Sequence, residues 1–199
     1  MNLLLLNSAQ CQDKLASIGG RQLEHLLKVQ RAQLGDSVRV GQIGGLMGQG
    51  VIKSLDSHQA TLQIYLDTPP PAPVPLTVIL ALPRPKMLRR TVQTVAAMGV
   101  KKLYLINSNR VEKSFWQTPL LDTDALEEQL ILGLEQCKDT LLPKIYLRKL
   151  FKPFVEDELA EVIKGSQALV AHPIIQAACP INCTSPVTVA IGPEGGFIP

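Results

Sequence analysis

Aromatic side chains are scarce in this sequence, and so are other features that would assign it at once to a class of function. Its 199 residues include four phenylalanines, three tyrosines and one tryptophan, so a broad aromatic platform for stacking bases is not indicated. An excess of charge of one sign is also lacking, because 20 basic and 17 acidic residues leave a formal net charge of +3. That balance alone does not indicate a nucleic-acid-binding protein.

Long hydrophobic runs are lacking as well. The N-terminus is apolar only over residues 3–6 and has no basic segment before them, which does not match a secretory signal. No later apolar run approaches the length of a membrane span. We therefore predict a cytoplasmic protein with no membrane partner.

Cysteines are few, and they are not spaced as metal ligands. Cys179 and Cys183 have three residues between them, but no further His or Cys lies at zinc-site spacing, so we predict no metal. Two phosphate-binding motifs are missing too, because no glycine-rich segment leads into Gly-Lys-Ser/Thr and none reads Gly-x-Gly-x-x-Gly. A nucleotide enzyme that depends on such a phosphate loop is therefore not favoured.

Proline, by contrast, is concentrated in one place. The segment 68–75 contains five prolines, which suit neither a helix nor a central strand and form a stiff, extended spacer. We place a domain boundary there, with one domain over residues 1–68, a linker over 69–75 and a second domain over 76–199.

Short strands are predicted before the linker. Residues 22–32 carry apolar side chains at helical spacing. Alternating segments at 38–40, 51–52 and 60–66 are separated by turn residues and by a glycine-rich stretch over 41–50. This pattern is typical of a small β-barrel.

The pattern of apolar residues changes after the linker, where continuous apolar runs alternate with amphipathic segments. Such alternation predicts an α/β domain built on a parallel sheet, whose ligands bind at the carboxyl ends of the strands. The predicted strands are 76–82, 102–106, 144–147, 167–171 and 187–191, and the predicted helices are 86–98, 124–137 and 154–164.

Polar or glycine-rich segments follow three of these strands. They are Asn107–Arg110, His172–Pro173 and Gly192–Gly196, the last reading Gly-Pro-Glu-Gly-Gly. Glycines there would let the backbone approach a ligand closely, although a plain tight turn is the alternative. His172 is either a base or ligand-loop residue or an ordinary turn residue. We expect the three segments to converge on one edge of the sheet.

Basic residues gather between positions 84 and 113, with Glu112 as the one acid among them. If they share a face, phosphate contact is natural; a solvated helix face is the alternative. The cluster comprises Arg84, Lys86, Arg89, Arg90, Lys101, Lys102, Arg110 and Lys113.

Several segments together resemble the RsmE-type 16S rRNA uridine-N3-methyltransferases of the SPOUT (α/β-knot) superfamily. Glu24–Arg31 followed by Leu34–Asp36 is similar to the family's HHLxxVLRxxxGD stretch. Residues 80–83 and 93–100 resemble LPK…QKATELGV, and Glu135, Gln136 and Pro143 resemble EQ…P. Ile191–Phe197 reads IGPEGGF, the most specific of these motifs.

This resemblance implies a PUA-like, RNA-binding β-barrel joined to a knotted domain that binds S-adenosylmethionine (SAM) and forms a homodimer. The implied reaction is methylation of N3 of uracil 1498 in the 16S rRNA of the small ribosomal subunit. Glu194 and Arg110 are the catalytic candidates; holding the loop by hydrogen bonds is the favoured alternative for Glu194, and holding phosphate is the alternative for Arg110. The candidate SAM-binding residues are Leu169, His172, Gly192, Glu194, Gly195 and Gly196, and the candidate RNA contacts are Lys28, Arg31, Arg39, Arg84, Arg89, Arg90 and Arg110.

The sequence also departs from the family pattern. QKATELGV is QTVAAMGV here, without its lysine and glutamate, and Asp139 stands at the arginine position of an EQSGR segment. The family's final LGxRILRxETA segment is not present in the sequence, so we expect an incomplete knot. Two alternatives stay open: a non-catalytic RNA-binding protein on the same scaffold, and a methyltransferase with another RNA target.

Overall fold

The computed structural model describes residues 2–173 and 178–198, which form two compact units. Neither unit is continuous in sequence, because residues 131–142 belong with the N-terminal part of the chain. The contiguous ranges predicted from the sequence did not anticipate this segment. Unit 1 comprises residues 1–72 and 131–142, and unit 2 comprises 73–130 and 143–199.

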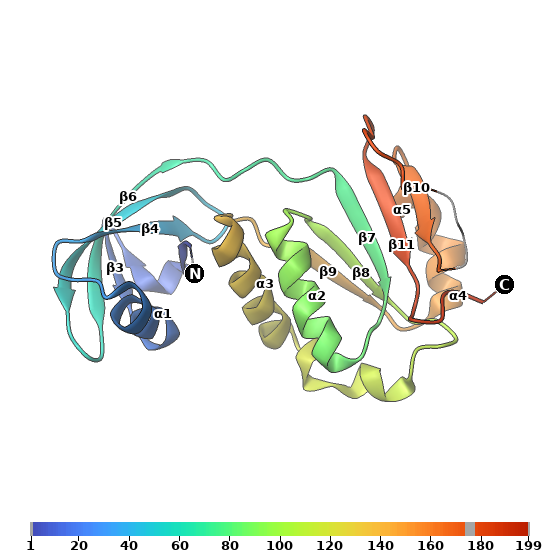
Figure 1. Ribbon diagram of the computed structural model, residues 1–199, viewed down its shortest axis with the longest axis horizontal. Helices are drawn as coiled ribbons and strands as arrows, with labels where there is room; N and C mark the ends of the chain where they lie inside the picture. The colour runs from blue at the N-terminus through green and yellow to red at the C-terminus, as the bar shows by residue number, and fades with distance from the viewer. Residues whose placement is uncertain (1, 174–177, 199) are drawn as a thin grey trace. The chain divides into compact units, whose positions relative to one another are not determined.

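Unit 1 is built on a curled, mixed sheet of six strands (Figure 1). Its order is β1-β4-β5-β6-β3-β2, with β1 parallel to β4 and all other neighbours antiparallel. The predicted small barrel is thus a half-barrel whose ladder begins at β1 and ends at β2. The strands are β1 (Leu4–Leu6), β2 (Cys11–Gln12), β3 (Leu15–Ile18), β4 (Ser37–Gln42), β5 (Met47–Leu55) and β6 (Ala60–Thr68).

Two predicted elements of unit 1 differ from the structure. The glycine-rich stretch is largely strand, because β5 runs through Gly48 and Gly50. At Gly48 the strand lies so close to the backbone of Tyr65 that no side chain would fit. The predicted helix 22–32 is α1 (Gly20–His25) continued by one π-helical turn, Leu26–Gln30, and ended by Arg31 in the left-handed conformation.

The segment 131–142 is tied to the strands of unit 1 by backbone hydrogen bonds. The carbonyl oxygen of Glu135 accepts from the amides of Asn2 and Leu3 at 2.9 and 3.1 Å, and that of Thr140 accepts from Gly44 at 2.8 Å. The carboxylate of Glu135 is fully buried and lies 2.8 Å from Nη1 of Arg21. Unit 1 therefore contains a charged group that is taken out of water and balanced by one arginine.

Unit 2 is built on a sheet of five parallel strands in the order β10-β11-β7-β8-β9, as predicted (Figure 1). After β7 the chain adds β8 and β9 on one side and then places β10 and β11 on the other. The point where the order reverses lies between β7 and β11. The strands are β7 (Leu76–Ala81), β8 (Lys102–Ile106), β9 (Lys144–Arg148), β10 (Gln167–Ala171) and β11 (Val187–Ile191).

The longer helices match their predicted positions. They are α2 (Pro85–Ala97) and α3 (Thr123–Cys137), and α2 buries Leu88, Val92 and Val95 along one face. The third predicted helix begins earlier than expected, as α4 (Phe151–Pro153), a π-helical turn over Phe154–Glu158 and α5 (Leu159–Ile163).

The π-helical turn of unit 2 is held to β9 by an ion pair. The guanidinium of Arg148 donates from Nε to both carboxylate oxygens of Glu158 at 2.7 Å. These hydrogen bonds raise the pKa of Arg148, although burial opposes them. Glu158 therefore links the π-helical turn to β9, in addition to being an acid near a helix start.

Candidate functional site

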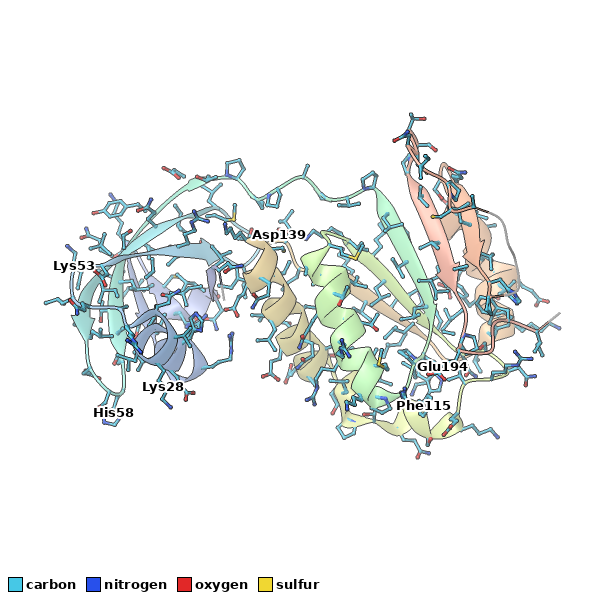
Figure 2. All side chains as sticks on the ribbon, in the orientation of Figure 1. Lys28, Lys53, His58, Phe115, Asp139 and Glu194 are labelled. Carbon is cyan, nitrogen blue, oxygen red and sulfur yellow. The ribbon has the colours of Figure 1, made fainter. Side chains whose placement is uncertain are left out.

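A pocket of about 430 Å³ lies in unit 2 at the carboxyl edge of the sheet, where the strand order reverses between β7 and β11. This is the place where open parallel sheets bind ligands. Figure 2 shows Glu194 and Phe115 close to each other at this edge, and both line the pocket. Its lining comes from the ends of three strands and from α2: Leu80–Arg84, Met87, Thr91, Arg110, Glu112, Phe115 and Gly192–Gly195.

The Gly-Pro-Glu-Gly-Gly segment forms a tight turn at one wall of this pocket. The amide of Gly196 donates to the carbonyl oxygen of Pro193 at 2.7 Å, and Gly196 has a φ of +72°, in the region that favours glycine. A Cβ at Gly195 would lie 2.7 Å from Nη1 of Arg110, and one at Gly196 would lie 2.8 Å from Nε2 of His172. Glycine is therefore favoured at Gly196 by its φ and by its neighbours, whereas a side chain at Gly195 would have to displace the end of Arg110.

Two side chains from other strand ends hold the turn in place. Arg110, after β8, donates from Nη1 to the carbonyl oxygen of Gly195. His172, after β10, places Nε2 at 3.2 Å from the carbonyl oxygen of Phe197. The three segments that sequence analysis placed at strand ends thus meet around one turn.

Charge of both signs lines the pocket. Arg84 and Arg110 contribute cations, and Glu112 and Glu194 contribute carboxylates. Arg84 Nη2 lies 3.7 Å from Glu194 Oε1, but the two side chains are 63% and 92% exposed, so this pair adds little stability. Glu194 forms this ion pair with Arg84, whereas Gly196 and Arg110 supply the hydrogen bonds that hold the turn.

Sequence reasoning missed part of this site. Met87, Thr91 and Phe115 line the pocket although no motif singled them out. Trp116 supports the loop after β8, because its Nε1 donates to Oδ1 of Asn107 at 3.2 Å. Trp116 is the single tryptophan of the chain, and this rarity was the one feature of the sequence that could have drawn attention to it.

The other predicted site residues lie outside the pocket lining. Leu169 is half-buried within β10, and Arg89 and Arg90 are exposed on α2. Lys28 and Arg31 follow α1 and belong to unit 1, as does Arg39 on β4 (Figure 2 labels Lys28).

The described part of the chain contains neither a metal-ligand cluster nor a membrane-spanning helix. Within residues 2–173 and 178–198, no group of three or more His, Cys, Asp or Glu side chains is placed to hold a metal ion. In the same part of the chain, no helix has the length and apolar character needed to cross a membrane.

Comparison with known proteins relates this fold to RNA methyltransferases. Residues 70–199 match the family described as RNA methyltransferase domain. The ribosomal RNA small subunit methyltransferase E of Treponema pallidum is 27% identical over 158 residues, which cover 77% of this chain and 59% of that protein. The chain thus spans about three fifths of that relative's length.

Two further comparisons cover nearly the whole chain. Methyltransferase E 1 of Borreliella burgdorferi is 24% identical over 200 residues, or 99% of this chain and 82% of that protein. The crystal structure of methyltransferase E from Neisseria gonorrhoeae, bound to S-adenosyl methionine, aligns with a TM-score of 0.69 at 17% identity. That alignment covers 98% of this chain and 82% of the Neisseria chain. The match over residues 70–199 confirms the relationship predicted from the motifs, and the chain belongs to the RNA methyltransferase domain family.

Proposed function

We propose that the protein transfers the methyl group of SAM to N3 of a uridine in 16S rRNA, at uracil 1498. The observation that carries this proposal is the pocket at the β7/β11 edge, bounded by the Gly192–Gly195 turn. Two relatives bear the name ribosomal RNA small subunit methyltransferase E, which supports the choice of RNA.

The lining of the pocket fits SAM. A ligand with an ammonium, a carboxylate and a sulfonium needs partners of both signs, which Glu112 and Arg84 offer. Leu80, Leu82 and Met87 supply apolar surface for an adenine ring. We assign Gly192 and Gly195 to backbone contact with the cofactor, and His172 and Gly196 to support of the turn.

The chain's own residues have two tasks in this reaction. SAM supplies an activated methyl group, so the protein mainly orients the acceptor. N3 of uracil must lose a proton as the new bond forms, and we propose the Glu194 carboxylate as its acceptor. Arg110 would hold the turn and stabilise the negative charge that develops on the base.

A non-catalytic RNA-binding protein is the second candidate, motivated by the altered segment before Gly99. Thr94 and Ala97 replace the family's lysine and glutamate, and both lie on α2 outside the pocket lining. The substitutions therefore leave the candidate SAM site unchanged, and we favour the enzyme. The homodimer and the cytoplasmic location stay predictions from the sequence.

The proposal can be tested in cells by deleting the gene. Methylation at N3 blocks the pairing edge of uracil, so reverse transcriptase stops at the modified base. We expect the stop in 16S rRNA to vanish on deletion and to return with the intact gene but not with a Gly195→Ala copy. A stop that persists after deletion would show that this protein is not the sole enzyme for the mark.

A further inference from the structure

The outer face of the sheet in unit 1 carries a row of polar and aromatic side chains. Arg39 on β4 lies directly opposite Gln49 on β5, and Gln49 lies directly opposite Tyr65 on β6. Residues in register on neighbouring strands point to the same face and are close enough to touch a common ligand. All three are exposed, and Tyr65 keeps 50% of its surface open to solvent.

These side chains line a second pocket, of about 440 Å³, formed wholly by residues of unit 1. Lys138, from the segment that follows α3, lies at its edge. The pocket shares no lining residue with the one at the carboxyl edge of unit 2. Any ligand held there is therefore additional to the reacting groups.

Positive charge dominates this second pocket. Within residues 2–173 and 178–198, neither Arg39 nor Lys138 takes part in an ion pair, so both cations are available to a ligand. The carboxylate in the lining is that of Asp67, which accepts a hydrogen bond from the Thr68 hydroxyl at 2.8 Å. Two cations against one carboxylate favour an anionic ligand.

The hydrogen bond made by Gln49 also fixes which of its polar atoms is free to bind a ligand. Oε1 of Gln49 accepts from the Ser37 hydroxyl at 2.7 Å, which leaves the amide nitrogen of Gln49 as a donor. An exposed aromatic ring, a side-chain amide and two cations are the groups that bind an unstacked nucleotide of a single strand, through its base, its polar edge and its phosphates.

We propose that this pocket binds one nucleotide of a single-stranded RNA segment, with the base stacked on Tyr65 and the phosphates held by Arg39 and Lys138. This proposal rests on the proposed function, because it takes the substrate to be RNA. It adds a second contact that binds the RNA outside the reaction site. Lys28 and Arg31, the other cations predicted to bind RNA in this unit, do not line the pocket.

This proposal is tested by the affinity of the full chain for a fluorescently labelled, U-rich single-stranded octaribonucleotide, measured in the absence of SAM. We expect Tyr65→Ala to weaken binding roughly tenfold and Tyr65→Phe, which keeps the ring, to stay within about twofold of the unchanged protein. Arg39→Gln and Lys138→Gln should each lower the slope of log affinity against log salt by about 0.7. Lys164→Gln, an exposed lysine of unit 2, is the matched control and should change neither quantity.

Stacking can also be read from the unchanged protein, which covers the case in which Tyr65→Ala fails to fold. A 2-aminopurine base in the octamer should lose fluorescence on binding, and the loss should persist in Tyr65→Phe. Affinity that is equal in the unchanged protein and in Tyr65→Ala, or 2-aminopurine fluorescence that does not change, would overturn the proposal. Uridine monophosphate that competes as well as the octamer would also overturn it, in favour of a free-nucleotide site.

Methyl transfer to small ribosomal subunits, measured in parallel, separates this proposal from the proposed function. Octamer binding that depends on Tyr65 with no methyl transfer would contradict the enzyme alone. Methyl transfer with octamer binding that ignores Tyr65 would contradict this pocket alone.

Discussion

The two sheets of this protein keep their polar side chains in different places. In unit 2 the inner strand β7 buries four consecutive residues, from Val78 to Ala81, and the charged groups of the pocket lie in the segments that follow the strands. In unit 1 strand β6 alternates, burying Leu62 and Ile64 while Tyr65 stays exposed. A parallel sheet buried on both faces offers a ligand its edge, whereas a curled sheet buried on one face offers its outer surface.

The largest effect on stability is expected in β8, inside the parallel sheet of unit 2. Leu105 in β8 is fully buried, and Leu105→Ala should lower the free energy of unfolding by about 2–5 kcal/mol, because it removes apolar contacts and leaves a cavity. Leu15→Ala is the control on the open face of unit 1, where the side chain is 49% exposed, and it should cost less than about 1 kcal/mol. Urea unfolding measures both changes. Equal losses would contradict the difference in burial between these two positions.

The next effect concerns the buried charge in unit 1. Arg21→Met leaves the Glu135 carboxylate buried without its cation and should cost about 3 kcal/mol. Adding Glu135→Gln to that variant should restore part of the loss, since the amide carries no charge. A double-mutant cycle of unfolding free energies gives the coupling. Additive losses would show that the two groups do not interact.

A third prediction tests the edge of unit 2. Gly195→Ala brings a methyl group against Nη1 of Arg110 and should push the guanidinium off the Gly195 carbonyl oxygen, which loosens the turn, so we expect SAM affinity to fall about tenfold. Gly45→Ala in unit 1 is the matched control, because its new methyl would meet Gln42 at ordinary contact distance. Calorimetric titration with SAM compares the two variants. Unchanged affinity in Gly195→Ala would remove the turn from the cofactor site.

The smallest effect is expected at the hairpin between β5 and β6. The backbone amides of His58 and Gln59 donate to Asp56 Oδ1 at 2.7 and 2.9 Å, and these bonds lower the pKa of Asp56. A lowered pKa stabilises the fold above the ordinary value of about 3.9 and loses that effect as the pH falls through the folded value. The stability difference between the unchanged protein and Asp56→Ala should therefore shrink below about pH 4. A pH-independent difference would contradict this account.

The sequence predicted unit 2 better than unit 1 for a physical reason. Strand-length apolar runs bounded by turn residues mark its strands, so 102–106, 167–171 and 187–191 were placed with the bounds that the structure shows. Unit 1 depends on contacts between distant segments. Its first strand pairs with β4, and Glu135 joins it from far along the chain, which no local pattern records.

The residues of the candidate site also fall into those that the sequence could locate and those that it could not. The Gly192–Gly196 turn and Arg110 could be located because motifs follow strand ends and parallel strands end at one edge. Phe115 and Met87 could not, because their place in the lining depends on how a loop and a helix pack. The row of Arg39, Gln49 and Tyr65 needs the register of three strands, which hairpin lengths alone did not fix.

The most direct test of the central claim is methyl transfer by the purified protein. Small ribosomal subunits from the deletion strain are incubated with SAM that carries a tritiated methyl group, and the nucleosides of their 16S rRNA are separated after digestion. The account predicts label in 3-methyluridine with the unchanged protein and a loss of label with Gly195→Ala. Intact SAM binding with no label in the RNA would contradict it, and the protein would then be an RNA-binding relative of the methyltransferases.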